Sequence, residues 1–177
     1  ASVETKKRIA DLFNRMTADP YARRLADGYA RGAARFGESW KYVDLWSMLY
    51  AYARLSSPKQ YLEIGTRRGH SLAAVLTGCA DAGAPMPSVC SCDLWVQAYA
   101  GTENPGPAFV TDEMKRLGFD TGIEFLSGSS HEVLAPFLRG ANRSFDLITV
   151  DGDHSRDGAR ADLLDVVDHL RLGGMLV

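Results

Sequence analysis

Apolar side chains recur at helical spacing through the first 58 residues. The pattern predicts a helix over 2–16, a second over 21–35 and a third over 42–55. The third segment is mostly apolar, so we expect it to be buried. The run Ser56-Ser57-Pro58 then ends this helical part of the chain.

Beyond residue 58, short apolar runs alternate with helical patterns. The predicted strands cover 60–64, 88–93, 122–126, 145–150 and 174–177. The predicted helices between them cover 70–82, 107–118, 130–140 and 156–170. This alternation is typical of an α/β fold, here a Rossmann-like, doubly wound, mostly parallel sheet. The carboxyl ends of its strands, and therefore its ligand, are expected at one edge.

The pattern divides the chain into two parts. Residues 1–58 are predicted to be an N-terminal helical segment that caps the ligand edge or forms a dimer contact, and residues 59–177 to be the Rossmann-like core. The last predicted strand is followed by no further sequence, so the fold is expected to be truncated at its fifth strand.

Composition and charge indicate a globular domain and argue against nucleic-acid-binding and membrane-spanning proteins. The chain has 177 residues, of which 46% are hydrophobic, and this is enough sequence for one domain with a sizeable core. Its formal net charge is −2. Residues 1–60 hold 11 Lys and Arg against 6 Asp and Glu, but form no dense basic stripe, so no nucleic-acid partner is expected. No apolar run approaches the roughly 18–20 residues that cross a bilayer, so no membrane partner is expected either.

The number of cysteines indicates the redox environment, and therefore the cellular compartment, of the protein. Cys79, Cys90 and Cys92 are an odd number, which favours a reduced, cytoplasmic environment over a disulfide framework. Cys90 and Cys92 share one predicted strand and are expected to face opposite sides of the sheet.

Residues 61–71 carry the most informative motif, Tyr-Leu-Glu-Ile-Gly-Thr-Arg-Arg-Gly-His-Ser. A short apolar strand ends near Glu63, and the chain turns through Gly65 and Gly69 into an apolar helix. Glycine permits φ > 0 and lets a backbone approach a ligand, and the first N–H groups of a helix can point at that ligand. The pattern predicts a nucleotide-type site, with an ordinary strand-to-helix turn as the alternative. The three-glycine spacing of the dinucleotide fingerprint is missing.

Polar groups follow the next two strands as well. Asp93 ends a strand about 25 residues after the glycine turn, where an acid can accept the hydroxyls of a ribose. Trp95 covers an adenine or belongs to the core. Ser129 or Ser130 can cap the following helix. Residues 96–108 are rich in Gly and Pro, so they form a substrate lid or a disordered loop.

The residues after the fourth predicted strand form the second motif that indicates a functional site. Phe145–Val150 is followed by Asp151, Asp153 and His154, so a buried strand brings two carboxylates and an imidazole to the active edge. Carboxylates so placed can bind Mg²⁺. An imidazole can take a proton from a hydroxyl. The alternative is that these groups only cap and solvate the next helix.

Four motifs in this order give a resemblance to a known family. They are Glu63-x-Gly65-x-x-x-Gly69, Asp93, Gly128-Ser-Ser130 and Asp151-Gly-Asp-His154-Ser. Over roughly residues 58–177 the chain resembles class I S-adenosylmethionine (SAM) methyltransferases, of the family that includes macrolide-sugar O-methyltransferases and cephalosporin-hydroxylase-like proteins.

The resemblance implies a role for each matching residue. His154 would be the general base, and Asp151 would be a catalytic residue and the first metal ligand. Asp153, which follows the same strand, is a weaker candidate for the metal. Members of the group complete the metal site with two acidic residues past the fifth strand, a place that this sequence does not reach. The implied SAM-binding residues are Glu63, Gly65, Thr66, Gly69, Ser71, Asp93, Leu94, Ser130 and His131.

The expected activity is therefore transfer of a methyl group from SAM to a hydroxyl of a small molecule, with Mg²⁺ assistance as an open point. The alternatives are a non-catalytic SAM-binding or interaction module and a nicotinamide-dependent oxidoreductase. The acceptor stays open between a sugar hydroxyl, a catechol-like diol and other hydroxylated metabolites, and so does assembly into a homo-oligomer.

Overall fold

The computed structural model describes residues 7–8, 11, 19–36, 43–96, 98–99 and 102–177. The chain divides into two compact units, residues 1–57 with 73–86, and residues 58–72 with 87–177. The predicted helix over 2–16 lies almost wholly outside the described residues. The predicted boundary near residue 58, between the N-terminal helical segment and the Rossmann-like core, coincides with the first change of unit. Residues 73–86, however, return to the first unit.

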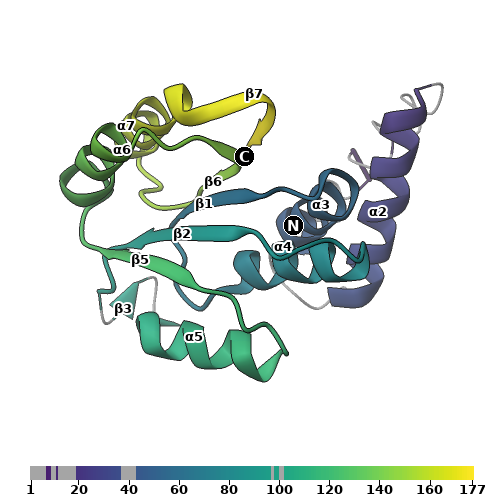
Figure 1. Ribbon diagram of the computed structural model, residues 1–177, viewed down its shortest axis with the longest axis horizontal. Coiled ribbons are helices and arrows are strands. Elements are labelled where there is room, and N and C mark those ends of the chain that lie inside the picture. The colour runs from purple at the N-terminus through teal and green to yellow at the C-terminus, as the bar shows by residue number, and fades with distance from the viewer. Residues whose placement is uncertain (1–6, 9–10, 12–18, 37–42, 97, 100–101) are drawn as a thin grey trace. The chain divides into compact units, whose positions relative to one another are not determined.

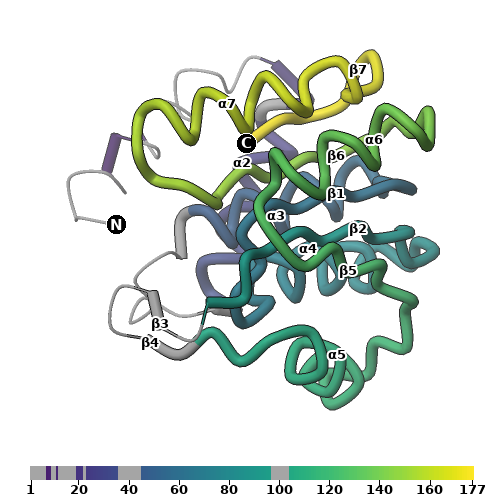
Figure 2. Tube along the Cα trace, turned by 90° about the vertical axis from the view of Figure 1, so that its left-hand side faces the viewer, coloured from purple at the N-terminus to yellow at the C-terminus, as the bar shows by residue number. Residues whose placement is uncertain are grey.

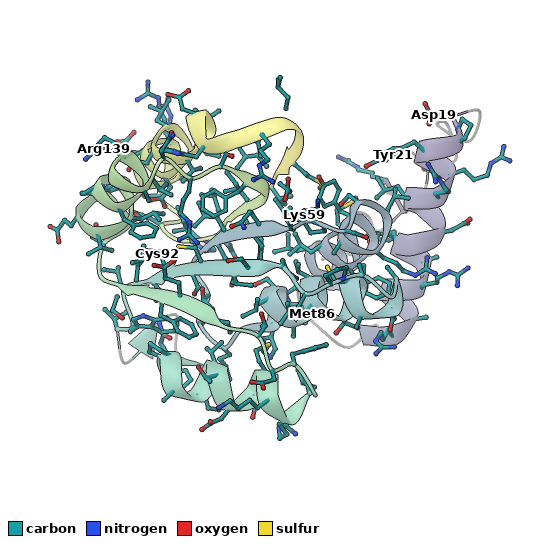
Figure 3. The ribbon with its side chains drawn as sticks, in the orientation of Figure 1. Asp19, Tyr21, Lys59, Met86, Cys92 and Arg139 are labelled. Atoms are coloured by element: carbon teal, nitrogen blue, oxygen red, sulfur yellow. The ribbon has the colours of Figure 1, made fainter. Side chains whose placement is uncertain are left out.

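The first unit is helical. It contains α2 (Pro20–Phe36), α3 (Val43–Ser56) and most of α4 (His70–Asp81). Asp19 accepts a hydrogen bond from the backbone N–H of Tyr21 at 2.7 Å, at the start of α2 (Figure 3). Pro20 follows directly, as expected at the first turn of a helix.

Small residues let the helices of this unit approach closely. A Cβ on Gly28 of α2 would lie 2.9 Å from the Cβ of Ala51, and one on Gly78 of α4 would lie 2.5 Å from the carbonyl oxygen of Tyr50. The hydroxyl of Tyr50 donates to Asp81 at 2.7 Å, which joins α3 to the end of α4.

The second unit is a five-stranded sheet in the order β5-β2-β1-β6-β7, and every pair of neighbours is parallel (Figures 1 and 2). Its strands are β1 (Gln60–Ile64), β2 (Ser88–Asp93), β5 (Ile123–Ser127), β6 (Phe145–Val150) and β7 (Leu170–Leu176). The prediction of a doubly wound parallel sheet is confirmed. The sequence order reverses between β1 and β6, and ligands of such sheets bind at this switch point.

One face of the sheet is packed by the helices near the end of the chain. These are the π-helix η1 (Ser130–Leu134), α6 (Ala135–Ala141) and α7 (Arg156–Val166), whereas α5 (Pro107–Arg116) lies at the β5 end in both views (Figures 1 and 2). The core on this face consists of Leu62, Ile64, Cys90, Cys92, Leu134, Leu138, Phe145, Ile148 and Val166.

The expectation that Cys90 and Cys92 face opposite sides was wrong. Residues two apart on a strand point to the same side, and both thiols belong to the core next to Leu134 and Leu138 (Figure 3 labels Cys92). All three cysteines are buried and free.

The predicted boundary between the last helix and the last strand differs from the structure. The last strand begins at Leu170 rather than 174, because α7 ends at Val166 and a single 3₁₀ turn (Val167–His169) follows it. Phe145 of β6 pairs with Leu170 and Leu147 pairs with Met175, so β7 bulges in between, at Gly173 with φ +80°. The sequence Gly173-Gly174 therefore marks a bulge inside the strand and not its start.

The Gly/Pro-rich segment 96–108 contains a short antiparallel hairpin. Its strands are β3 (Ala98–Tyr99) and β4 (Thr102–Glu103), which the sequence pattern did not predict.

Gly65 is the position where the fold depends most on glycine. Its φ is +89°, and a Cβ there would lie 2.1 Å from the carbonyl oxygen of Asp151. We therefore expect Gly65→Ala to lower the free energy of unfolding by at least about 1–2 kcal/mol, the cost of the left-handed backbone alone. Urea unfolding would measure the loss. Gly140→Ala, in α6 with nothing within 4 Å, is the matched control and should be neutral or slightly stabilising. Equal stability of both variants would contradict this role.

Candidate active site

Four loops that follow parallel strands meet at the carboxyl edge of the sheet. Backbone hydrogen bonds join them: Gly65 N–H to Cys92 O at 2.9 Å, Gly128 N–H to Asp93 O at 3.0 Å, and Asp151 N–H to Ile64 O at 2.9 Å. The motifs predicted from the sequence therefore lie side by side along one edge, as parallel strands require.

The glycine turn is held by its own backbone. Gly65 and Gly69 both have positive φ, as does Arg67 at +54°, and Gly69 N–H donates to the carbonyl of Thr66 at 2.8 Å. The freedom of glycine was expected to serve a close approach of the ligand. In the structure Gly65 makes room for the backbone of Asp151, and Gly69 for Val110 of α5, where a Cβ would lie 3.0 Å away. Their approach to a ligand stays a prediction.

Asp93 connects three segments. Its Oδ2 accepts the N–H of Arg67 at 2.7 Å, and its Oδ1 accepts the N–H of Trp95 at 2.8 Å and the side-chain amide of Asn104 at 2.9 Å. The predicted ribose-binding carboxylate thus also fixes the glycine turn and the segment after the hairpin. Such charge-assisted hydrogen bonds are stronger than neutral ones.

The two residues after Asp93 differ in exposure. Leu94 is 60% exposed, an apolar side chain suited to an aromatic base beside the carboxylate. Trp95 packs edge-on against Phe125, with ring centroids 5.9 Å apart, which supports the core alternative for its ring. Its indole Nε1 is buried and has no hydrogen-bond partner among the residues that the structure describes.

Glu63 lies in a buried polar network beneath the glycine turn. Its Oε1 accepts a hydrogen bond from Tyr61 at 3.0 Å and another from Ser71, and the Tyr61 hydroxyl also lies 3.2 Å from that of Thr149. Burial raises the pKa of Glu63 to about 7, although these hydrogen bonds act in the opposite direction. Its Oε2 has no partner in the described part of the chain.

Thr66 belongs to the same layer of polar side chains. It is buried, and its hydroxyl is hydrogen-bonded to that of Ser91 on β2. The four predicted cofactor residues Glu63, Gly65, Thr66 and Ser71 are thus brought together, three of them through side chains that bond to polar groups of the protein.

Asp151 and His154 form the pair that the sequence motif predicted. The Nε2 of His154 lies 3.3 Å from Oδ1 of Asp151, and the two side chains are 56% and 50% exposed. Partial burial raises the pKa of Asp151, against the opposing effect of His154. The backbone position of Asp151 beside Gly65 puts this pair at the switch point of the sheet.

Asp153 is engaged with the start of α7. Its Oδ1 accepts the N–H of Ser155 at 2.8 Å, which lowers the pKa of this carboxyl, and the Ser155 hydroxyl accepts the N–H of Gly158 at 3.0 Å. This agrees with the capping alternative for Asp153. Among the described residues, no three His, Cys, Asp or Glu side chains lie close enough to hold a metal ion.

Ser130 and His131 reach towards α7. The hydroxyl of Ser130 donates to buried Asp162, and Nδ1 of His131 lies 2.6 Å from Asp165, whose hydrogen bond raises the pKa of His131. Their predicted contacts with an adenine stay a prediction. Asn104 and Asp162 were missed, because nothing in the local pattern connects them with their partners Asp93 and Ser130, which are 11 and 32 residues away. Tyr61 was missed although it lies two residues before Glu63 on the same strand, where side chains two apart share a face.

The comparison with known proteins decides the family. Residues 62–177 match the family model described as a methyltransferase domain. The chain belongs to this methyltransferase family. The predicted resemblance to class I SAM-dependent methyltransferases is confirmed, and so is the prediction of an enzyme of that class. No curated protein matches the sequence.

Solved structures agree with this fold. SAH-bound PaMTH1, a methyltransferase of Podospora anserina, is 20% identical over 99% of this chain and 69% of its own, with a TM-score of 0.56. CalS11, a TDP-rhamnose 3′-O-methyltransferase of calicheamicin biosynthesis, is 16% identical over 99% and 77%, with a TM-score of 0.60. An O-methyltransferase of Bacillus cereus in complex with SAH is 14% identical over 91% and 68%, with a TM-score of 0.55.

No helix among the described residues is both long enough and apolar enough to span a membrane.

Glu63 should make the stability of the methyltransferase fall as the pH rises. Its pKa is about 7 in the folded chain against an ordinary 4.5, so between these values the unfolded state loses the proton first. The folded state then loses on the order of 2–3 kcal/mol between about pH 4.5 and 7. Glu63→Gln should remove this component, whereas Glu132→Gln, the same change on an exposed side chain, should keep it. Urea unfolding at pH 5 and pH 8 measures the difference, and identical pH dependence in all three proteins would refute it.

Proposed function

We propose that this methyltransferase transfers a methyl group from SAM to a hydroxyl of a small molecule. The observation that carries the proposal is the juxtaposition of the Asp151–His154 pair with the Gly65 turn at the switch point of the sheet. The site offers what SAM requires: carboxylate acceptors at Asp93, an exposed apolar side chain at Leu94 and a buried, partly unpaired carboxylate at Glu63.

Each residue would have a distinct part in holding SAM. Asp93 would accept a ribose hydroxyl, and Leu94 would pack against the adenine, with Ser130 and His131 near the edge of the base. Glu63 would attract the positively charged end of the cofactor, with Ser71 and Thr66 keeping that carboxylate in place. Gly65 and Gly69 would keep the turn between these groups in its shape. Bound SAM supplies a methyl group on a positively charged sulfur.

His154 would act as the general base for the acceptor hydroxyl. A neutral hydroxyl is a weak nucleophile until its proton is removed, and an imidazole is suited to take that proton near neutral pH. Asp151 at 3.3 Å would orient the ring and stabilise the imidazolium that forms. The rest of the site would contribute mainly by positioning the two reactants.

A metal ion is a separate part of the proposal. Asp151 would be a ligand of Mg²⁺, with Asp153 as the second candidate. The described residues do not provide a third ligand, and Asp153 already accepts the Ser155 N–H. The proton transfer from the acceptor hydroxyl to His154 needs only the protein's own groups.

The acceptor is proposed to be a small hydroxylated molecule. CalS11 is a TDP-rhamnose 3′-O-methyltransferase, which makes a sugar hydroxyl a suitable first substrate class to test. A cytoplasmic location and a homo-oligomer stay part of the proposal, with residues 1–58 either covering the acceptor site or forming the contact between copies. It includes no nucleic-acid or membrane partner.

Cofactor binding is tested by thermal unfolding with SAH and with NADH. SAH at 100 times its Kd should stabilise the protein by about 2.7 kcal/mol, whereas NADH should have no effect. Asp93→Ala should abolish most of the SAH response, since each charge-assisted hydrogen bond is worth about 1.5–3 kcal/mol. The variant should also melt earlier than the wild type, because three internal hydrogen bonds are lost. An unchanged SAH affinity in Asp93→Ala, measured by calorimetry, would rule out the ribose assignment.

Catalysis by His154 is tested by His154→Ala. General-base catalysis is typically worth about 10²–10⁴-fold, so kcat should fall by that order while SAH affinity changes little. His169→Ala is the matched control, since it is the same substitution at a histidine with no part in the proposed mechanism. The ring of His169 bonds to the carbonyl of Arg143 just before β7 begins. A His154→Ala enzyme with normal kcat and a lowered melting temperature would show a capping role. SAH binding by the wild type without turnover of any hydroxyl acceptor would favour the non-catalytic module.

A further inference from the structure

The carboxylate of Asp93 has little capacity left for a ligand. A carboxylate offers about four acceptor positions. Three are filled, one on Oδ2 by the N–H of Arg67 and two on Oδ1 by Trp95 and Asn104. A ribose presents two adjacent hydroxyls, each of which needs an acceptor when it is removed from water. Asp93 alone therefore leaves one of them without a partner.

Asn104 has the acceptor that is missing. The residue is only 9% exposed, and its Nδ2 donates to Asp93 at 2.9 Å, so its Oδ1 must be turned away from that carboxylate. This Oδ1 is buried and has no hydrogen-bond partner within the described part of the chain. A buried amide oxygen without a partner is uncommon and unfavourable, which indicates a ligand or a water molecule there.

Trp95 adds a second sign of a polar ligand. The backbone N–H of Trp95 donates to Oδ1 of Asp93, the same oxygen that accepts the amide of Asn104. Trp95 has φ +53°, a left-handed conformation that is rare for a bulky side chain. Its indole Nε1 is a buried donor that no described residue accepts. One carboxylate oxygen thus fixes two residues that have unpaired polar atoms, one an acceptor and one a donor.

We propose that Oδ1 of Asn104 accepts a hydrogen bond from one ribose hydroxyl of the cofactor, while Oδ2 of Asp93 accepts the other. The inference rests on the proposed binding of SAM and adds a residue outside the four sequence motifs. It also makes residues 102–106 a wall of the cofactor site. Trp95 would contribute its indole N–H as a donor to the same nucleoside.

The test is a cycle of protein and ligand changes, measured by calorimetry. SAH, 2′-deoxy-SAH and 3′-deoxy-SAH are titrated into the wild type, Asn104→Ala and Asn142→Ala, the last being the same change at the end of α6. Asn104→Ala should weaken SAH about 3- to 10-fold, the effect of one neutral hydrogen bond. One of the two deoxy ligands should bind Asn104→Ala as tightly as SAH does, although it binds the wild type less tightly. Asn142→Ala should behave as the wild type.

A merely structural role gives a different pattern. If Asn104 only supports Asp93, all three ligands weaken by the same factor and the discrimination between them persists, which would overturn the proposal. Unchanged affinities in Asn104→Ala would also overturn it, since water would then be the partner of Oδ1. If Asn104→Ala does not fold, Asn104→Ser, whose oxygen is too close to the backbone to take the place of Oδ1, should show the same loss of discrimination. No SAH binding by the wild type would instead refute the proposed function itself.

Discussion

The carboxylate of Asp93 ties the glycine turn to the rest of the carboxyl edge. It accepts hydrogen bonds from Arg67 in the turn, from Trp95 in its own loop and from Asn104 after the hairpin, all between 2.7 and 2.9 Å. Because each bond involves a charged acceptor, the three segments are held more firmly than neutral contacts would hold them. The residue that would bind the nucleoside therefore also shapes the site around it, and any change of Asp93 alters both functions at once.

The switch point of the sheet connects this region with the Asp151–His154 pair. β1 and β6 are adjacent and parallel, so the loop at Gly65 contacts the backbone of Asp151 so closely that a Cβ would overlap it. Below the turn, Glu63 is buried with Tyr61 and Ser71 and retains an unpaired oxygen. A buried carboxylate that lacks a full set of partners is unfavourable for folding. Its presence under the turn is understandable if a cationic ligand offsets that cost.

Sequence reasoning was accurate where the evidence was local. β1, β2 and β6 were predicted at their observed bounds, because each is a short apolar run with a clear polar stop. The predicted start of β7 was wrong, since a Gly-Gly pair can begin a strand or form a bulge within it.

In the site, Asp151 and His154 were predicted to be together because they are three residues apart. The partners Asn104 and Asp162 were not predicted. Their bonds to Asp93 and Ser130 span 11 and 32 residues, and such tertiary pairs leave no periodic signal in the sequence. Ser130 and His131 were correctly placed at the start of the helical turn that follows β5, but their bonds to α7 depend on how that helix packs.

Binding of the cofactor at the carboxyl edge, between the Gly65 turn and Asp93, is the proposal on which the others depend. Amide hydrogen exchange with and without SAH tests it most directly, because protection reports which backbone segments a ligand closes. We expect slower exchange in residues 65–72, 93–96 and 102–106, with no change in α7 and β7. Unaltered exchange in these three segments, with protection elsewhere in the chain, would contradict it.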